Sequence, residues 1–226
     1  MNARWLMGLS RGNEQARQQV RERFRQELLS EQPKEGVQAA LAAASNARRG
    51  LWQQLCDLLA EGAVANEAVW WALLRGLSHP KTRAQELAWE ACWTMTERLE
   101  TRLLADRLTC ALVDLTVDEN VTPCLLALLR EATNRPCVEL RATLEPLRSC
   151  HKRLCYTWPA LAEDFKETQA VVEAATQHLK NLPLPAAVAP TAINLPLPAT
   201  AQDMDGSEAE KEETNLWKQL KSKFRS

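Results

Sequence analysis

Apolar residues recur at helical spacing through most of the chain, from about residue 13 to about residue 180. In the first such stretch, Ala16, Val20, Phe24 and Leu28 follow one another at intervals of four, while Arg, Glu and Gln fill the other positions. Intervals of three and four place side chains on one face of a helix. The pattern therefore predicts an amphipathic helix here and at each comparable stretch that follows.

Capping residues and prolines divide this region into eight or nine helices. The expected N-caps are Asn13, Asn46 and Asn66. Gly62 is expected to end the third helix, and Pro159 is expected to open the last one. Pro136 is expected to open a helix that Pro146 kinks or ends, because a proline ring clashes with the preceding turn of a helix.

Short connections between these helices predict that consecutive helices run antiparallel. Pairing the helices from Asn46 gives units at 46–78, 79–118 and 119–157, each in the range of helical-repeat solenoids. The turn Ser78-His79-Pro80-Lys81 resembles an inter-helix turn of a HEAT repeat. We therefore expect an all-α fold. It is either an irregular helical-repeat-like superhelix of the HEAT or armadillo kind or a multi-helix bundle, and a disordered tail follows it.

The chain divides into four expected segments. Residues 1–12 are a flexible N-terminal segment, 13–180 an α-helical domain, 181–213 a disordered linker that is rich in Pro and Ala and then acidic, and 214–226 a basic amphipathic segment. The apolar residues near the start, Trp5 to Leu9, with the arginines around them, fit either a lipid anchor or a capping element of the helical domain.

Composition narrows the class of protein. The formal net charge of −1 gives no global field that would favour nucleic acid. The seven cysteines lack the spacing of a disulfide framework, and several lie within apolar helical runs. No signal-peptide core is apparent, and no apolar run approaches the roughly 18 residues of a membrane span. We therefore expect a cytoplasmic or nuclear protein that is neither secreted nor transmembrane.

Candidate catalytic chemistry is scarce. The chain has no phosphate loop, no dinucleotide-binding glycine motif, no nucleophile elbow and no His-Glu-x-x-His motif. Cys150, His151 and Cys155 do not have the four-ligand spacing of a structural zinc site. We predict no catalytic residue, cofactor or metal and no small-molecule substrate, and keep an enzyme of unrecognised class as an alternative.

Trp70 and Trp71 are adjacent, so on a helix their side chains point about 100° apart. One ring is then expected at the edge of a groove that binds a protein partner, because tryptophan is enriched at interaction hot spots. The alternative is that a solenoid buries its helices on two sides and accommodates both rings.

The segment 130–153 holds an excess of basic residues and supports a second hypothesis, a helical protein that binds nucleic acid. The residues concerned are Arg130, Arg135, Arg141, Arg148, Lys152 and Arg153. A surface that tracks phosphates normally carries a stronger excess of charge, so we expect nucleic acid not to be the partner.

The C-terminal part contains the hexapeptide NLPLPA twice, at 181–186 and 194–199, which fits either a peptide ligand or a spacer. The end of the chain then combines an apolar stripe with lysines. The predicted partner-binding residues here are Leu216, Trp217, Leu220 and Phe224, with Lys218, Lys221 and Lys223. Such a segment can fold on a protein partner, on an anionic membrane surface or on its own domain.

These observations together predict a non-enzymatic scaffold or adaptor. Its helical body would bind one protein partner, and its C-terminal segment would bind a second partner or an anionic membrane surface.

Overall fold

The computed structural model describes residues 3–10, 13–114 and 118–180, which belong to one compact unit, Met1–Leu182. These residues form α-helices and two 3-10 helices and contain no strand, which confirms the all-α prediction. The elements are α1 (Ala3–Leu6), η1 (Met7–Ser10), α2 (Glu14–Leu28), α3 (Lys34–Ala44), α4 (Arg49–Ala65), α5 (Glu67–Gly76), α6 (Thr82–Arg98), α7 (Thr101–Asp114), α8 (Val121–Ala132), η2 (Val138–Thr143), α9 (Leu144–Leu154) and α10 (Pro159–Lys180).

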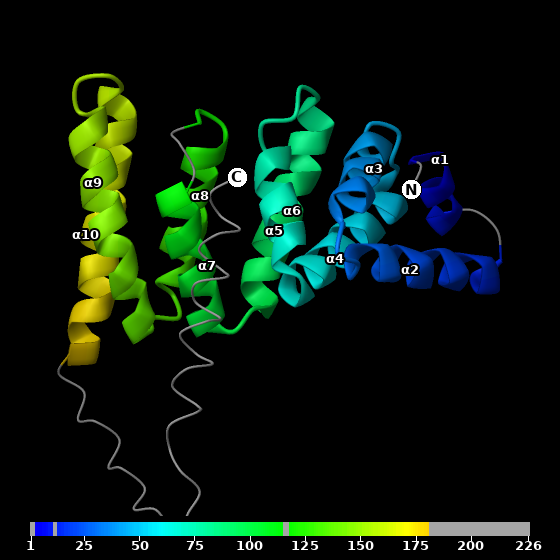
Figure 1. The fold of residues 1–226 in the computed structure, drawn as a ribbon, viewed down its shortest axis with the longest axis horizontal. Coiled ribbons are helices and arrows are strands. Elements are labelled where there is room, and N and C mark those ends of the chain that lie inside the picture. The colour runs from blue at the N-terminus through cyan, green and yellow to red at the C-terminus, as the bar shows by residue number, and fades with distance from the viewer. Residues whose placement is uncertain (1–2, 11–12, 115–117, 181–226) are drawn as a thin grey trace, which may run out of the picture. The chain divides into compact units, whose positions relative to one another are not determined.

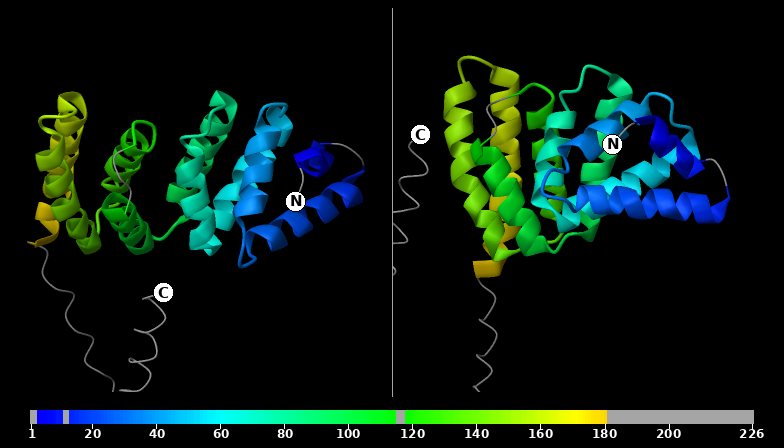
Figure 2. Two further views of the ribbon diagram at one scale, coloured as in Figure 1. Left: turned by 45° about the horizontal axis from the view of Figure 1, so that its top comes forward. Right: turned by 45° about the vertical axis from the view of Figure 1, so that its right-hand side comes forward.

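From α5 to α10, consecutive helices form antiparallel pairs that stand side by side, whereas α2 runs across the direction of α3 (Figure 1). The pairs α5 with α6, α7 with α8, and α9 with α10 are each in contact. Helices of neighbouring pairs are also in contact, α6 with α8 and α8 with α10. α6 further contacts α4, which precedes the first of these pairs (Figure 2). The core is a continuous apolar layer of Leu, Ala, Val and aromatic side chains between the helices.

Several helix ends follow local sequence signals. Asn13 caps α2 by accepting from Ala16 N at 2.9 Å, and Asn66 caps α5 by accepting from Ala68 N at 3.0 Å. Pro159 occupies the first position of α10. A side-chain acceptor satisfies one backbone N–H of a first turn, and proline has no such N–H to lose there.

Other ends differ from the prediction. Asn46 does not cap α4, which begins at Arg49 after Arg48, and Gly62 does not end it, because α4 continues to Ala65. Gly62 instead packs closely against Leu28 of α2, so its small size serves a helix contact and not a C-cap. Pro146 does not break a helix that began at Pro136. It lies in the first turn of α9, after η2, where a missing N–H costs little.

The N-terminal residues, which the sequence suggested to be flexible, contain two short helical turns. Leu6 of α1 and Leu9 of η1 are fully buried in the core. The Arg23 guanidinium of α2 lies 5.3 Å from the centre of the Trp5 ring. These contacts fit a capping element that covers the first helices better than they fit a free lipid anchor.

Side-chain hydrogen bonds between elements recur at a nearly constant separation along the chain. Most of those in the described residues join positions 33 to 44 apart, such as Arg21 with Gln54 and Arg107 with Ala63. Asn66 Nδ2, for example, donates to the carbonyl of Leu28 at 2.9 Å, 38 residues earlier. A constant offset arises when each pair of helices contacts the equivalent part of the next pair.

Two glycines of α4 test this packing. A Cβ at Gly62 would lie 2.9 Å from Leu28 Cδ1 and 3.1 Å from Leu28 Cβ, whereas a Cβ at Gly50 would meet nothing within 4 Å. We expect Gly62→Ala to lower the free energy of unfolding by about 1–2 kcal/mol despite its better helix propensity. Gly50→Ala, the matched control, should raise it by up to about 1 kcal/mol. Urea denaturation measures both values, and a Gly62→Ala variant as stable as Gly50→Ala would contradict the described contact.

Candidate interaction surfaces

Trp70 and Trp71 have different surroundings on α5. Trp70 is fully buried in the core. Trp71 is half-buried, and its Nε1 donates to Glu67 Oε1 at 3.1 Å, one turn earlier on the same helix. Trp70 therefore offers no surface to a partner, and of the two predicted contact residues only Trp71 is placed to make one.

Trp71 lines a groove of about 510 Å³ between α5 and the start of α3, which we call the Trp71 groove. Its residues are Glu31, Gln32, Pro33, Lys34 and Glu35 from one side and Ala68, Trp71, Ala72 and Arg75 from α5. Pro33 and Ala72 are buried, so the floor is apolar, while the charged residues of the rim are exposed and carry both signs. An apolar floor with a mixed polar rim is suited to a peptide or protein side chain.

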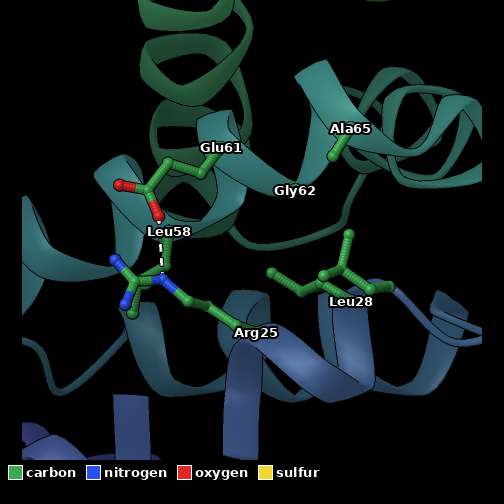
Figure 3. A pocket seen from close by; sticks show the side chains of 7 residues that line it. Arg25, Leu28, Leu58, Glu61, Gly62 and Ala65 are labelled. Atoms are coloured by element: carbon green, nitrogen blue, oxygen red, sulfur yellow. Dashed lines mark hydrogen bonds and ion pairs between the residues drawn. The ribbon is translucent and has the colours of Figure 1, made fainter. Parts of the chain in front are cut away.

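A smaller hollow of about 160 Å³ lies between α2 and α4 (Figure 3). Leu28 and Leu58 line it, and the ion pair between Arg25 Nε and Glu61 Oε2, at 3.0 Å, spans its edge. Its volume falls below the few hundred Å³ of usual ligand pockets. We interpret it as a packing gap between two helices.

The basic residues of the segment 130–153 are engaged mainly inside the unit. Arg135 Nη1 donates to the Leu99 carbonyl at 3.2 Å, and its Nη2 donates to the Thr96 carbonyl. Arg141 Nη2 donates to the Thr176 carbonyl at 3.0 Å. Arg135 thereby satisfies carbonyls at the end of α6, which otherwise lack a donor, and Arg141 ties its segment to α10.

The remaining arginines of this segment pair with α10 or with their own helix. Arg130 donates to Thr168 Oγ1 at 2.8 Å, and Arg148 Nη2 contacts Glu173 Oε1 at 2.8 Å. Hydrogen bonds from Gln169 and Arg148 lower the pKa of Glu173. Arg153 donates to Cys150 Sγ at 3.1 Å. Arg130, Arg135 and Arg141 are thus half-buried against the body, whereas Arg148, Lys152 and Arg153 are exposed.

One aromatic surface was missed from the sequence. The spacing of Trp89 and Trp93, one helical turn apart on α6, favours packing of both rings in the core. In the structure both are only half-buried, and they line a hollow with Gln53 and Cys56 of α4. Their spacing of one helical turn together with Glu86, Glu90 and Glu97 at nearby positions was the signal that could have identified an exposed face.

The described residues contain no group of three or more His, Cys, Asp or Glu side chains arranged to hold a metal ion. His151 Nε2 and Cys155 Sγ approach to 3.6 Å on α9, but no third ligand joins them there. Burial raises the pKa of the Cys92 thiol far above its usual value, so this sulfur behaves as a small apolar group.

The pKa of the Asp118 carboxyl lies below its usual value. Burial alone would raise the pKa of Asp118, but hydrogen bonds from Asn120 N, Ser78 Oγ and Val121 N outweigh this effect and lower it. The Ser78 Oγ bond to Asp118 Oδ1 is 2.9 Å long and ties the α5–α6 turn to the start of α8. This carboxylate therefore has a structural role as a cap.

The predicted contact residues of the C-terminal segment, Leu216 to Phe224, lie outside the described residues, as do the two NLPLPA copies. Among the helices that the structure describes, none combines the length and the apolar character needed to cross a membrane.

Comparison with known proteins does not assign a family. No protein-family model matches the chain, and no curated protein matches it. One similar solved structure is described as an engineered protein. It is 12% identical over 80% of this chain and 85% of that chain, with a TM-score of 0.34.

The role of Arg135 can be measured. Arg135→Ala removes the donors of two carbonyls at the end of α6, so we expect the free energy of unfolding to fall by about 1–3 kcal/mol. Lys152→Ala, an exposed position in the same basic segment, should change it by less than about 0.5 kcal/mol. Thermal or urea unfolding followed by circular dichroism gives both values. Equal stability of the two variants would show that the Arg135 contacts are not structural.

Proposed function

We propose that this chain is a non-enzymatic helical scaffold or adaptor of the cytoplasm or nucleus, with a body that is an irregular superhelix of the HEAT or armadillo kind. The body binds a protein partner through the Trp71 groove. The segment 214–226 binds a second partner or an anionic membrane surface. The constant offset of the hydrogen bonds between helix pairs supports the repeat-like architecture.

The observation that carries this proposal is the half-buried Trp71 on the apolar floor of its groove. A tryptophan that is held in one orientation binds a partner with a small loss of conformational entropy. Trp71 is held in this way by its bond to Glu67. Aromatic anchors at the centre of an apolar patch, surrounded by polar residues, typically dominate the energy of a protein interface.

The residue pattern of 214–226 supports the second half of the proposal. Leu216, Trp217, Leu220 and Phe224 form one apolar stripe at helical spacing, and three lysines and an arginine lie at other positions. A segment this short is not a stable helix alone, so its order comes from the surface that it binds. Apolar burial and attraction to negative charge then act together.

Nucleic-acid binding through 130–153 remains the alternative function. It is less well supported because Arg130, Arg135, Arg141 and Arg148 all have partners within the body. Binding to phosphates would have to replace these bonds, which reduces the net gain from each contact.

Replacement of Trp71 tests the body surface. Trp71→Ala in the full chain should weaken binding of the body's protein partner by at least about tenfold, because it removes the aromatic anchor. Quantitative affinity purification with mass spectrometry identifies that partner and compares the variants.

The matched control is Tyr156→Ala, because Tyr156 is 96% exposed and distant from the groove in sequence. Arg75→Glu, on the exposed rim of the groove, provides a second variant that leaves the core intact. Unchanged recovery of the partner by both Trp71→Ala and Arg75→Glu would contradict the proposed surface.

Removal of 214–226 tests the C-terminal function. The truncated chain should lose one set of partners, or its attachment to phosphatidylserine vesicles, while it keeps the partner of the Trp71 groove. A full chain with Trp217→Ala and Phe224→Ala should behave in the same way, since the apolar stripe is lost but the lysines remain. If the same partners are recovered and vesicle binding is unchanged, the C-terminal proposal is wrong.

A further inference from the structure

The outer face of α6 carries a second aromatic surface, distinct from the Trp71 groove. The ring centres of Trp89 and Trp93 are 5.5 Å apart, with an angle of 52° between the ring planes. Both side chains are half-buried and line a hollow of about 430 Å³ together with residues of α4. Two large rings are thus held together at the surface, where each keeps part of its apolar area in water.

This face is preformed by contacts between α4 and α6. Trp52 of α4 is nearly buried, and its Nε1 donates to the Glu90 carboxylate. The Arg83 guanidinium lies 4.0 Å from the centre of the Trp52 ring, on the side of α6. A surface that is ordered before binding spares a partner the entropic cost of arranging it.

Three glutamates lie on the same side of α6 as the two rings. Glu86, Glu90 and Glu97 are exposed and follow one another on α6 at intervals of four and seven, which places them on the side of Trp89 and Trp93. The two nearest arginines are already paired, Arg83 with Glu86 at 3.2 Å and Arg98 with Asp57 of α4 at 2.6 Å. Among the described residues, Glu97 has no cationic partner. The face therefore combines an aromatic pair with carboxylates that neighbouring cations do not fully balance.

We propose that this α6 tryptophan surface (Trp89 and Trp93 with Glu86, Glu90 and Glu97) binds a short cationic amphipathic helix of a partner protein. The apolar stripe of such a helix would cover the rings, and its lysines or arginines would reach the carboxylates and the ring faces. The carboxylates disfavour nucleic acid and anionic lipid, since like charges repel. The inference does not depend on the Trp71 groove.

The chain itself contains a sequence with the required chemistry. Residues 214–226 place Leu216, Trp217, Leu220 and Phe224 on one stripe and carry basic residues elsewhere. Within it, Leu216-Trp-Lys-Gln-Leu220 resembles Leu51-Trp-Gln-Gln-Leu55 of α4, the segment whose Trp52 bonds to Glu90 of α6. A labelled synthetic peptide of sequence 214–226 is therefore a suitable probe.

The test is titration of the full chain into this peptide, followed by fluorescence anisotropy at low and physiological salt. We expect saturable binding that weakens as salt increases. Glu97→Lys and Trp93→Ala should each weaken binding by about tenfold. Glu22→Lys, the matched control on an exposed position of α2, should change it by less than about twofold.

Charge reversal separates a direct contact from an indirect effect. A peptide with Lys218, Lys221 and Lys223 changed to Glu should show no detectable binding to the unmodified protein. The same peptide should bind the Glu97→Lys variant detectably. Glu97 is exposed, so its replacement leaves the core intact even if Trp93→Ala lowers stability.

Three results would overturn the inference. The first is absence of peptide binding at low salt, and the second is an equal effect of Glu97→Lys and Glu22→Lys. The third is binding that occurs only after Trp217 and Phe224 of the full chain are changed to Ser, which would identify the chain's own segment as the occupant. Because the Trp71→Ala test concerns a different surface, failure of that test leaves these outcomes unaffected.

Discussion

The carbonyls at the ends of helices need hydrogen-bond donors, and at the ends of α4 and α6 arginines from later in the chain supply them. Arg107 of α7 donates to the carbonyls of Ala63 and Val64 at the end of α4, and burial lowers the pKa of this guanidinium. Arg135 does the same for Thr96 and Leu99 at the end of α6. A buried carbonyl without a donor costs about 1–3 kcal/mol, so each bond holds one helix pair against the next. The hollow of Trp89 and Trp93 lies between α4 and α6, the two helices whose ends these arginines contact.

Arginines and tryptophans of the body differ in how much of each side chain remains available to a partner. Arg135 and Arg141 of the segment 130–153 are bound within the body, while several tryptophans keep an accessible face. Trp71 lies at a groove with charges of both signs, whereas Trp89 and Trp93 lie beside carboxylates. We therefore expect the two surfaces to select partners of different chemistry, which is the property that an adaptor requires.

Local signals in the sequence were sufficient for the all-α fold and for helix ends set by neighbouring residues, such as Asn13, Asn66 and Pro159. They were not sufficient where contacts with residues distant in sequence determine a helix end or the exposure of a side chain. In the local sequence Gly62 resembles a residue that ends a helix. Its contact with Leu28 of α2 arises only from tertiary packing, so neighbouring residues do not reveal it. The 100° separation of Trp70 and Trp71 indicated that one ring would face outward, but packing against other helices determines which one. The exposure of Trp89 and Trp93 likewise depends on how α4 packs against α6, since residues of both helices line their hollow.

We propose that the body's protein partner contacts the Trp71 groove and not the basic segment 130–153. Hydroxyl-radical footprinting of the full chain, alone and in complex with that partner, tests it directly, because tryptophan and tyrosine side chains both oxidise readily. Trp71 reports on the groove, and Tyr156, which is 96% exposed, reports on the region beside the basic segment. We predict that oxidation of Trp71 falls severalfold in the complex while that of Tyr156 is unchanged. Protection of Tyr156 with no change at Trp71 would contradict the claim.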